Sequence, residues 1–420
     1  MSESRSFRRA ARLLGASLTV LVVAGSGRSL ANDPQEFSQI ERGRYLAVAS
    51  DCASCHTVPE SKKPFAGGRP IETPFGNIVA PNITPDPETG IGVWTADAFD
   101  NALRKGRGRT GSHLYPAMPY NAYTKMSRRD VDDIFAYLKT VEPVRNKVES
   151  NTLPFPFNIR AAMGVWNALY FKEGEFKPNP EKSPEWNRGA FLVEGPGHCG
   201  ACHTPKSFLG GDKTSQHLQG SQLQGWFAPN ITNDPNGGLA KWSTDDLVVY
   251  LSSGHNRITA ATGPMAEEVE LSSSKMQEGD LHAIATYLQS VGGKAEAAKP
   301  IAATDPAMVA GDAIYRDQCS ACHGLDGKGV PKLFPSLVDS GVSGPSDPTT
   351  AVRIILRGAR SIGTKREPTA PGMPSYGTQL DDAQVAAVAT YIRNAWGRSG
   401  PAVPPSTVKD VRADTAMRPD

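Results

Sequence analysis

The sequence predicts a mainly α-helical protein, built from three tandem helical bundles that are joined by loops rich in glycine and proline. Three observations predict this fold class. A Cys-x-x-Cys-His motif occurs three times in the 420 residues and uses all six cysteines. The sequence around the first motif recurs around the second, and a more divergent version surrounds the third. Hydrophobic residues make up only 39% of a chain with 41 glycines and 34 prolines, which indicates small, loop-rich domains whose apolar core is completed by a bound group.

The three motifs have the attachment pattern of c-type haem. Two thiols three positions apart can each form a thioether with a vinyl group of one porphyrin, and the next residue then offers an imidazole to the iron. We therefore expect three covalently bound haem c groups, one in each bundle. The expected attachment residues are Cys52, Cys55, Cys199, Cys202, Cys319 and Cys322, and the expected axial histidines are His56, His203 and His323.

Two other uses of paired cysteines fit this sequence poorly. A single Cys-x-x-Cys can be a redox dithiol or half of a zinc site. Zinc would require further Cys or His pairs at finger or ribbon spacing, and every cysteine is already used. A redox dithiol has no reason to carry a neighbouring histidine three times, so the pattern favours haem.

Each bundle also has one methionine in a loop stiffened by proline or glycine, namely Met118, Met265 and Met373. We expect these as the second axial ligands, because a thioether is a soft ligand that favours Fe(II) and raises the reduction potential. A methionine can also be apolar filler of a core, but three equivalent positions favour ligation. His113 and His255 precede two of the loops and offer a bis-histidine alternative, although a surface position or a propionate contact is favoured for both.

Iron with both axial positions filled by side chains transfers electrons and does not bind substrate, peroxide or oxygen. The sequence therefore argues against a peroxidase or an oxidase, and no residue is predicted to be catalytic.

The repeats set the expected domain limits. The Ala-Pro-Asn-Ile-Thr segment at 80–84 recurs at 228–232, and Trp94 recurs as Trp242. The expected organisation is a first repeat at 32–146, a connecting segment with a helix at 147–180, a second repeat at 181–292, a linker at 293–303, a third repeat at 304–398 and a disordered tail at 399–420.

Periodic apolar residues predict a helix that ends in glycine in the middle of each repeat, and a closing helix at its end. The closing helices are expected at 130–140, 280–290 and 381–396, each with an acidic residue in its first turn. Opening and closing helices that cross next to haem are the cytochrome c architecture.

Residues 1–31 are predicted to be a secretory signal peptide. Four arginines precede an apolar stretch at 13–24, and Ser29-Leu30-Ala31 forms a small-x-small cleavage site. A transmembrane anchor is the alternative, but the apolar run is short for a bilayer. Removal of this leader would leave 40 basic and 42 acidic residues, a balance that gives no reason to expect a nucleic-acid partner.

Over residues 36–398 the chain resembles the triheme cytochrome c subunits of bacterial membrane-bound dehydrogenases, of the alcohol and gluconate dehydrogenase type. The resemblance rests on the tandem motifs, the doubled Ala-Pro-Asn-Ile-Thr segment, and the sequences around the three methionines. These sequences are Ala-Met-Pro-Tyr at 117–120, Gly-Pro-Met-Ala-Glu at 263–267, and Gly-Met-Pro at 372–374 followed by Thr-Tyr-Ile-Arg-Asn-Ala-Trp at 390–396.

The resemblance implies a partner. A catalytic subunit with flavin, pyrroloquinoline quinone or molybdopterin would oxidise an alcohol, aldehyde or sugar acid, and this subunit would relay the electrons to ubiquinone or to a downstream cytochrome or oxidase. The expected location is the periplasm or the periplasmic face of the inner membrane. Some members have an apolar C-terminal anchor that is missing here, so membrane association is expected to be peripheral. A free-standing periplasmic multihaem carrier, or an enzyme with one five-coordinate haem, are the alternatives.

Overall fold

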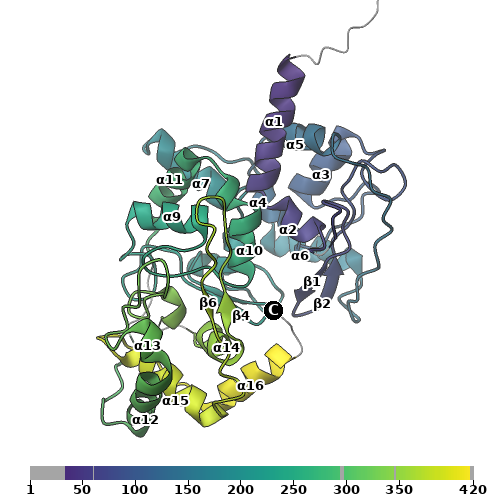
Figure 1. Ribbon diagram of the computed structural model, residues 1–420. Helices are drawn as coiled ribbons and strands as arrows, with labels where there is room; N and C mark the ends of the chain where they lie inside the picture. Colours follow the sequence, from purple (N-terminus) through teal and green to yellow (C-terminus); the bar gives the residue numbers. More distant parts are fainter. Residues whose placement is uncertain (1–33, 60, 294–297, 345–346, 417–420) are drawn as a thin grey trace, which may run out of the picture.

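The computed structural model describes residues 34–59, 61–293, 298–344 and 347–416 (Figure 1). The expected signal peptide at 1–31 lies outside the described residues. Helices dominate, and the strands of the described residues form three two-stranded antiparallel sheets. The mainly helical class predicted from the sequence is confirmed.

The first repeat is organised by the crossing of its opening and closing helices. At the crossing, a Cβ atom on Gly43 would lie 1.8 Å from the carbonyl oxygen of Asp133, so only glycine allows the two backbones to approach this closely. Its elements are α1 (Pro34–Ala49), α2 (Cys52–His56), β1 (Pro70–Thr73), β2 (Gly76–Val79), α3 (Ala96–Lys105), α4 (Tyr120–Tyr123) and α5 (Arg128–Leu138). The buried core includes Leu46, Phe99, Leu103, Val131, Ile134 and Leu138.

The second repeat has the same crossing. A Cβ atom on Gly189 would lie 1.9 Å from the carbonyl oxygen of Ala283. Its elements are α7 (Pro184–Glu194), α8 (Gly200–His203), the 3-10 turn η2 (Thr214–Gln216), β3 (Ser221–Leu223), β4 (Trp226–Ala228), α9 (Thr244–Ser253), α10 (Pro264–Leu271), η3 (Ser273–Lys275) and α11 (Glu278–Leu288).

The third repeat crosses its helices at Gly311, where a Cβ atom would lie 2.3 Å from the carbonyl oxygen of Ala387. Its elements are α12 (Pro306–Ile314), the π-helical turn η4 (Tyr315–Cys319), α13 (Ser320–His323), η5 (Gly341–Ser343), α14 (Thr349–Arg357), β5 (Ala359–Arg360), β6 (Gly372–Met373), α15 (Asp382–Asn394) and α16 (Pro405–Ala416). Each of the three repeats therefore has a crossing between its opening helix and its closing helix.

The closing helices lie close to where the sequence predicts them, with α5 and α11 displaced by two residues towards the N-terminus. In α5 the reason is a capping box, because Ser127 accepts a hydrogen bond from the Asp130 amide while the Asp130 carboxylate accepts one from the Ser127 amide. Asp130, expected to begin the helix, is therefore its third residue.

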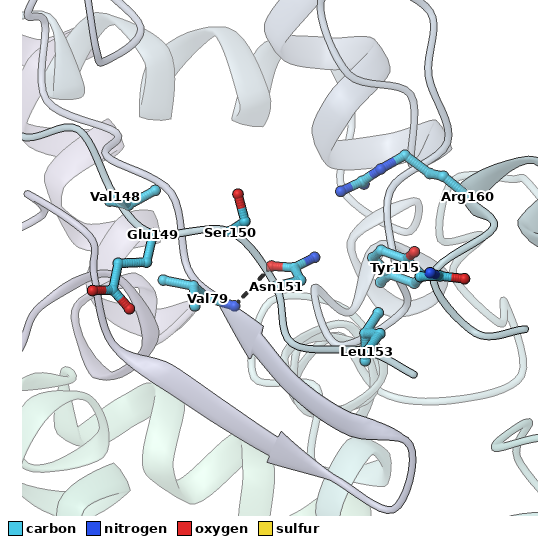
Figure 2. Close-up of a pocket in the computed structure, with 9 residues that line it drawn as sticks. Val79, Tyr115, Val148, Glu149, Ser150, Asn151, Leu153 and Arg160 are labelled. Carbon is cyan, nitrogen blue, oxygen red and sulfur yellow. Dashed lines mark hydrogen bonds between the residues drawn. The ribbon is translucent and has the colours of Figure 1, made fainter. Parts of the chain in front are cut away.

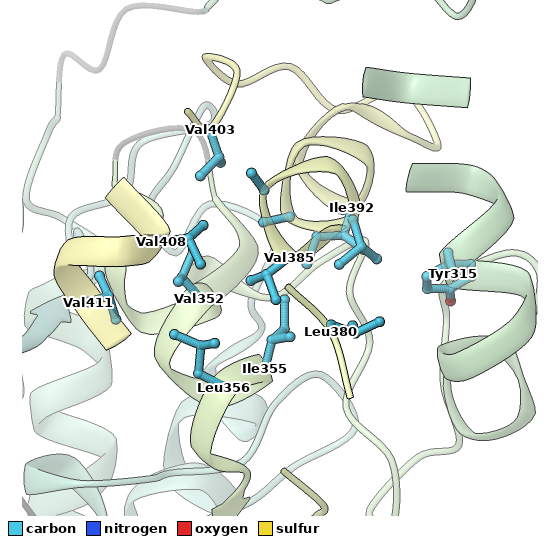
Figure 3. Packing of buried hydrophobic residues seen from close by; sticks show 13 residues of the cluster. Tyr315, Val352, Ile355, Leu356, Leu380, Val385, Ile392, Val403, Val408 and Val411 are labelled. Atoms are coloured by element: carbon cyan, nitrogen blue, oxygen red, sulfur yellow. The ribbon is translucent and has the colours of Figure 1, made fainter. Parts of the chain in front are cut away.

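The C-terminal tail is the clearest correction. The sequence predicts disorder from 399 onward, yet α16 packs on α14 and α15 of the third repeat (Figure 3). Val403, Val408 and Val411 are buried in the core of that repeat. The Arg412 guanidinium bonds the Asp382 carboxylate at 2.8 Å, and it also bonds the Leu380 carbonyl oxygen. Three well-spaced valines and one ion pair thus order a segment whose composition is mostly polar.

The connecting segment contains the expected helix, α6 (Met163–Tyr170), which follows the short turn η1 (Arg160–Ala162). Trp166 is buried, and its indole nitrogen donates to the carbonyl oxygen of Leu209 at 3.0 Å. The helix therefore packs against the second repeat. Among the described residues, none of the helices combines the length and the apolar character needed to cross a membrane.

Candidate functional site

Each Cys-x-x-Cys-His motif lies at a short helix, α2, α8 or α13. Helical geometry places residues three and four positions apart on one face, so both thiols and the imidazole of a motif can meet one flat group. None of the six cysteines, all of which the structure describes, is joined in a disulfide. Burial raises the pKa of Cys52 to about 12 and those of Cys202 and Cys319 to about 11, so these are not the activated thiolates of a redox dithiol.

The three motif histidines share one hydrogen bond. Nδ1 lies 2.7 Å from the Pro81 carbonyl oxygen in His56, 2.7 Å from that of Pro229 in His203, and 2.9 Å from that of Pro335 in His323. A carbonyl oxygen can only accept, so Nδ1 carries the hydrogen and the Nε2 lone pair is available to a metal. This is the tautomer that an axial ligand requires.

Burial also sets the charge of these rings. It lowers the pKa of His56, His203 and His323, which keeps each imidazole neutral at pH 7. Neutral imidazole is the form that binds iron. The donor set therefore fits the group that the sequence predicts.

A continuous cavity of about 3230 Å³ is lined mainly by the first two repeats, with further residues from the connecting segment and the third repeat. This volume is several times that of a pocket for one drug-sized ligand, typically about 300–1,000 Å³, so it has room for more than one large prosthetic group. Nine of the twelve predicted site residues line it, and eight of these belong to the first two repeats: Cys52, Cys55, His56, Met118, Cys199, Cys202, His203 and Met265. The structure thus brings the predicted residues of the first and second repeats to one apolar space.

The third set is placed differently. Met373 lines the far end of the same cavity, but Cys319, Cys322 and His323 do not. Cys319 and Met373 instead pack against the same buried cluster of the third repeat. Both residues therefore contact one core, and of the two only Met373 also lines the large cavity.

The methionine loops are held by local backbone structure. The Tyr120 amide donates to the Met118 carbonyl oxygen at 2.7 Å, and Met373 lies on β6 opposite Ala359 of β5. Met265 is the second residue of α10, directly after the sharp turn at Gly263, whose φ is 55°. Each sulfur is therefore carried by an ordered segment.

The two rival histidines do not line the cavity. His113 contacts Asn167 on α6, with its Nδ1 3.3 Å from the amide nitrogen. His255 is only 3% exposed, so the surface position favoured for it is wrong. The backbone of His255 forms a bridge with Ala260, and the carbonyl oxygen of the preceding Gly254 accepts a hydrogen bond from Ser361 of the third repeat.

A smaller pocket of about 350 Å³ lies where β2 meets the connecting segment (Figure 2). The Val79 amide donates to the side-chain oxygen of Asn151 at 3.0 Å, and the Arg160 guanidinium stacks on the Tyr115 ring, 4.6 Å from its centroid. None of the predicted site residues lines this pocket. It forms part of the packing that supports the hairpin beside the large cavity.

Sequence reasoning missed the hairpins β1–β2 and β3–β4. They lie between the motif histidine and its proline carbonyl, which are 25 and 26 residues apart in the first two repeats but only 12 apart in the third. The longer spacings in the first two repeats were the feature of the sequence that could have predicted the hairpins. Arg69 before β1 and Trp226 on β4 both reach other repeats, through Glu267 and Arg353 respectively.

Comparison with known proteins agrees with this geometry. A family model described as cytochrome c matches residues 40–142 and 308–396. The gluconate 2-dehydrogenase cytochrome c subunit of Pantoea cypripedii is 39% identical over 91% of this chain and 91% of its own length. The fructose dehydrogenase cytochrome subunit of Gluconobacter japonicus is 38% identical over 95% of this chain and 88% of its own. The alcohol dehydrogenase (quinone) cytochrome c subunit of Komagataeibacter europaeus is 36% identical over 90% and 84%.

These similarities each span 90% or more of the chain. Membership of such a family implies covalently bound haem c. The resemblance inferred from the sequence is confirmed: the chain belongs to the family of cytochrome c subunits of gluconate, fructose and alcohol dehydrogenases.

Proposed function

We propose that this chain is the electron-transfer subunit of a dehydrogenase complex and that it carries three haem c groups, one in each repeat. The proposed number of three haems is supported by one observation: in all three repeats a motif histidine forms a hydrogen bond with a proline carbonyl oxygen. The first two copies line the large cavity, whereas His323 and Pro335 of the third copy do not. Each repeat is then a cytochrome c domain.

Each haem would be held by two cysteines, one histidine and one methionine. The sets are Cys52, Cys55, His56 and Met118; Cys199, Cys202, His203 and Met265; and Cys319, Cys322, His323 and Met373. When bound, the haem supplies a one-electron redox centre. The proline carbonyl orients the imidazole and raises its basicity, and the methionine thioether favours the reduced state. With a histidine and a methionine both bound to each iron, no position on the iron would remain for a substrate.

The partner would be the catalytic subunit that oxidises the substrate. Three of the related proteins are named for gluconate, fructose and alcohol, which supports an alcohol, an aldehyde or a sugar acid as the substrate class. This subunit would pass the electrons to ubiquinone or to a downstream cytochrome or oxidase. Its location would be the periplasm, after cleavage of residues 1–31, with peripheral attachment to the inner membrane.

The haem count is tested by the intact mass of the purified protein and by its reduced visible spectrum. We expect the mass of the polypeptide from residue 32 onward plus three haems, and sharp bands after dithionite reduction. A mass with two haems would remove the third site from the proposal, and a mass with none would overturn the proposal.

The role in the cell is tested by gene deletion. We expect respiration on one alcohol or sugar derivative to stop, while membranes of the deletion strain still reduce an artificial acceptor with that substrate. Restoring the gene supplies the control. Unchanged respiration on every such substrate, together with purification free of any dehydrogenase, would instead indicate a free-standing carrier.

A further inference from the structure

We infer that Arg69 is a positioning residue that couples the first and second haem sites, because it fastens α10, the helix that carries Met265, to the attachment helix of the first haem. The inference rests on the proposed function, since it takes Cys52–His56 as an attachment site and Met265 as an axial ligand. It adds a residue of the first repeat to the control of the iron in the second repeat.

The contacts of Arg69 join the two repeats directly. Its Nη1 donates to the carbonyl oxygen of Ser54, inside the first motif, at 2.5 Å. Both of its terminal nitrogens donate to the carboxylate of Glu267, with Nη2 2.8 Å from Oε2. Such a two-point pair fixes orientation as well as distance. Glu267 comes two residues after Met265 on the same helix, α10.

The elements around Arg69 are also in direct contact, so the ion pair joins two helices that already pack together. Helix α10 packs on α2, so the helix that carries Met265 rests on the helix that carries Cys52 and Cys55. The side chains of Arg69 and Glu267 are 27% and 28% exposed, which leaves the pair less screened by solvent than a surface ion pair. The hydrogen bond from Arg69 to Glu267 raises the pKa of the guanidinium, so the positive charge persists.

Other acidic groups lie at the same contact. Burial, with a contribution from Glu268, raises the pKa of Asp51 to about 8, and burial raises the pKa of Glu268 to about 7. A carboxyl group with a pKa near 8 is mostly protonated at pH 7, so charge repulsion at this contact is small. Loss of Arg69 would act by removing the hydrogen bonds that join Glu267 on α10 to the Ser54 carbonyl oxygen on α2, and α10 could then shift away from α2. Met265 is the second residue of α10, so the displacement would reach its sulfur.

The test uses the purified holoprotein with Arg69→Met and cyanide, which replaces methionine on ferric haem. We expect cyanide to bind one of the three haems faster than in the wild type, by on the order of tenfold or more, as expected for the loss of a charged hydrogen bond. The midpoint potential of the same haem should fall. That haem should be the one whose spectrum changes in Met265→His. Arg69→Lys, which keeps the charge but not the two-point geometry, should restore part of the effect.

Arg44→Met is the matched control, because Arg44 pairs with Glu41 on an exposed face of the first repeat. We expect wild-type cyanide kinetics from it. If Arg69→Met fails to incorporate haem, Glu267→Gln decides, with a smaller change of the same sign. The inference is overturned if both variants match Arg44→Met, or if the Arg69 and Glu267 effects add without coupling. A wild-type protein without three Met-ligated haems would instead contradict the proposed function.

Discussion

Asp280 shows how a single residue joins two repeats. Its carboxylate accepts hydrogen bonds from the Tyr45 hydroxyl on α1 at 2.5 Å and from Arg188 Nη2 on α7 at 2.7 Å. Burial alone would raise the pKa of Asp280, but the bonds from Arg188 and Tyr45 outweigh it and lower that pKa below its usual value. Burial and the contact with Asp280 raise the pKa of Tyr45 to about 12, so the phenol remains a donor. The ionised carboxylate therefore stabilises the junction.

The variant Asp280→Asn should destabilise the holoprotein at pH 7 by about 1–3 kcal/mol, because the donors of Arg188 and Tyr45 lose a charged acceptor. A lowered folded-state pKa contributes stability above the unfolded-state value, about 3.9, and loses it as pH falls through the folded-state value. The difference between wild type and variant should thus shrink below about pH 4. Urea unfolding at several pH values measures it. Asp245→Asn, at an exposed position, is the control, and a difference that persists in acid would contradict the argument.

At the scale of elements, the repeats are defined by helix crossings. Gly43, Gly189 and Gly311 each lie where an opening helix meets the backbone of a closing helix. A carbonyl oxygen of the closing helix lies so close that no side chain fits. The opening and closing helices therefore pack in the same way in all three repeats, even though the third repeat diverges most in sequence.

The variant Gly189→Ala should therefore lower the free energy of unfolding by about 1–3 kcal/mol, because the new methyl group overlaps the Ala283 carbonyl and the helices must separate. Gly279→Ala is the matched control. Gly279 lies on α11, and an added Cβ meets nothing within 4 Å, so alanine should be neutral or stabilise the helix by about 0.5–1 kcal/mol. Thermal unfolding of both holoproteins decides the matter. Equal stability of the two variants would show that the crossing tolerates a side chain.

For the whole molecule, the sequence predicts the local features well. Periodic apolar residues locate the closing helices, and motif spacing identifies the residues that line the large cavity. The tail was missed because its buried valines become a core only through contact with α14 and α15, which lie earlier in the chain. The contact of Arg69 with Glu267 was missed for the same reason, since it joins residues 198 positions apart. The ligand assignments themselves stay predictions.

The proposed haem sites of the first and second repeats share one cavity, so the three sites do not have equivalent surroundings. Cys52 and Cys199 line one space, whereas Cys319 does not, and Met373 alone of the third set reaches that space. The double variant Cys319→Ser with Cys322→Ser should lose the mass of one haem and leave the midpoint potentials of the other two unchanged. The double variant Cys52→Ser with Cys55→Ser should also lose one haem, but it should shift the potential of the second haem, because that haem loses an apolar neighbour and gains solvent. Spectroelectrochemistry of both proteins tests this asymmetry. Equal shifts in the two proteins would contradict this argument. They would mean that the third site influences the other two as strongly as the first site influences the second.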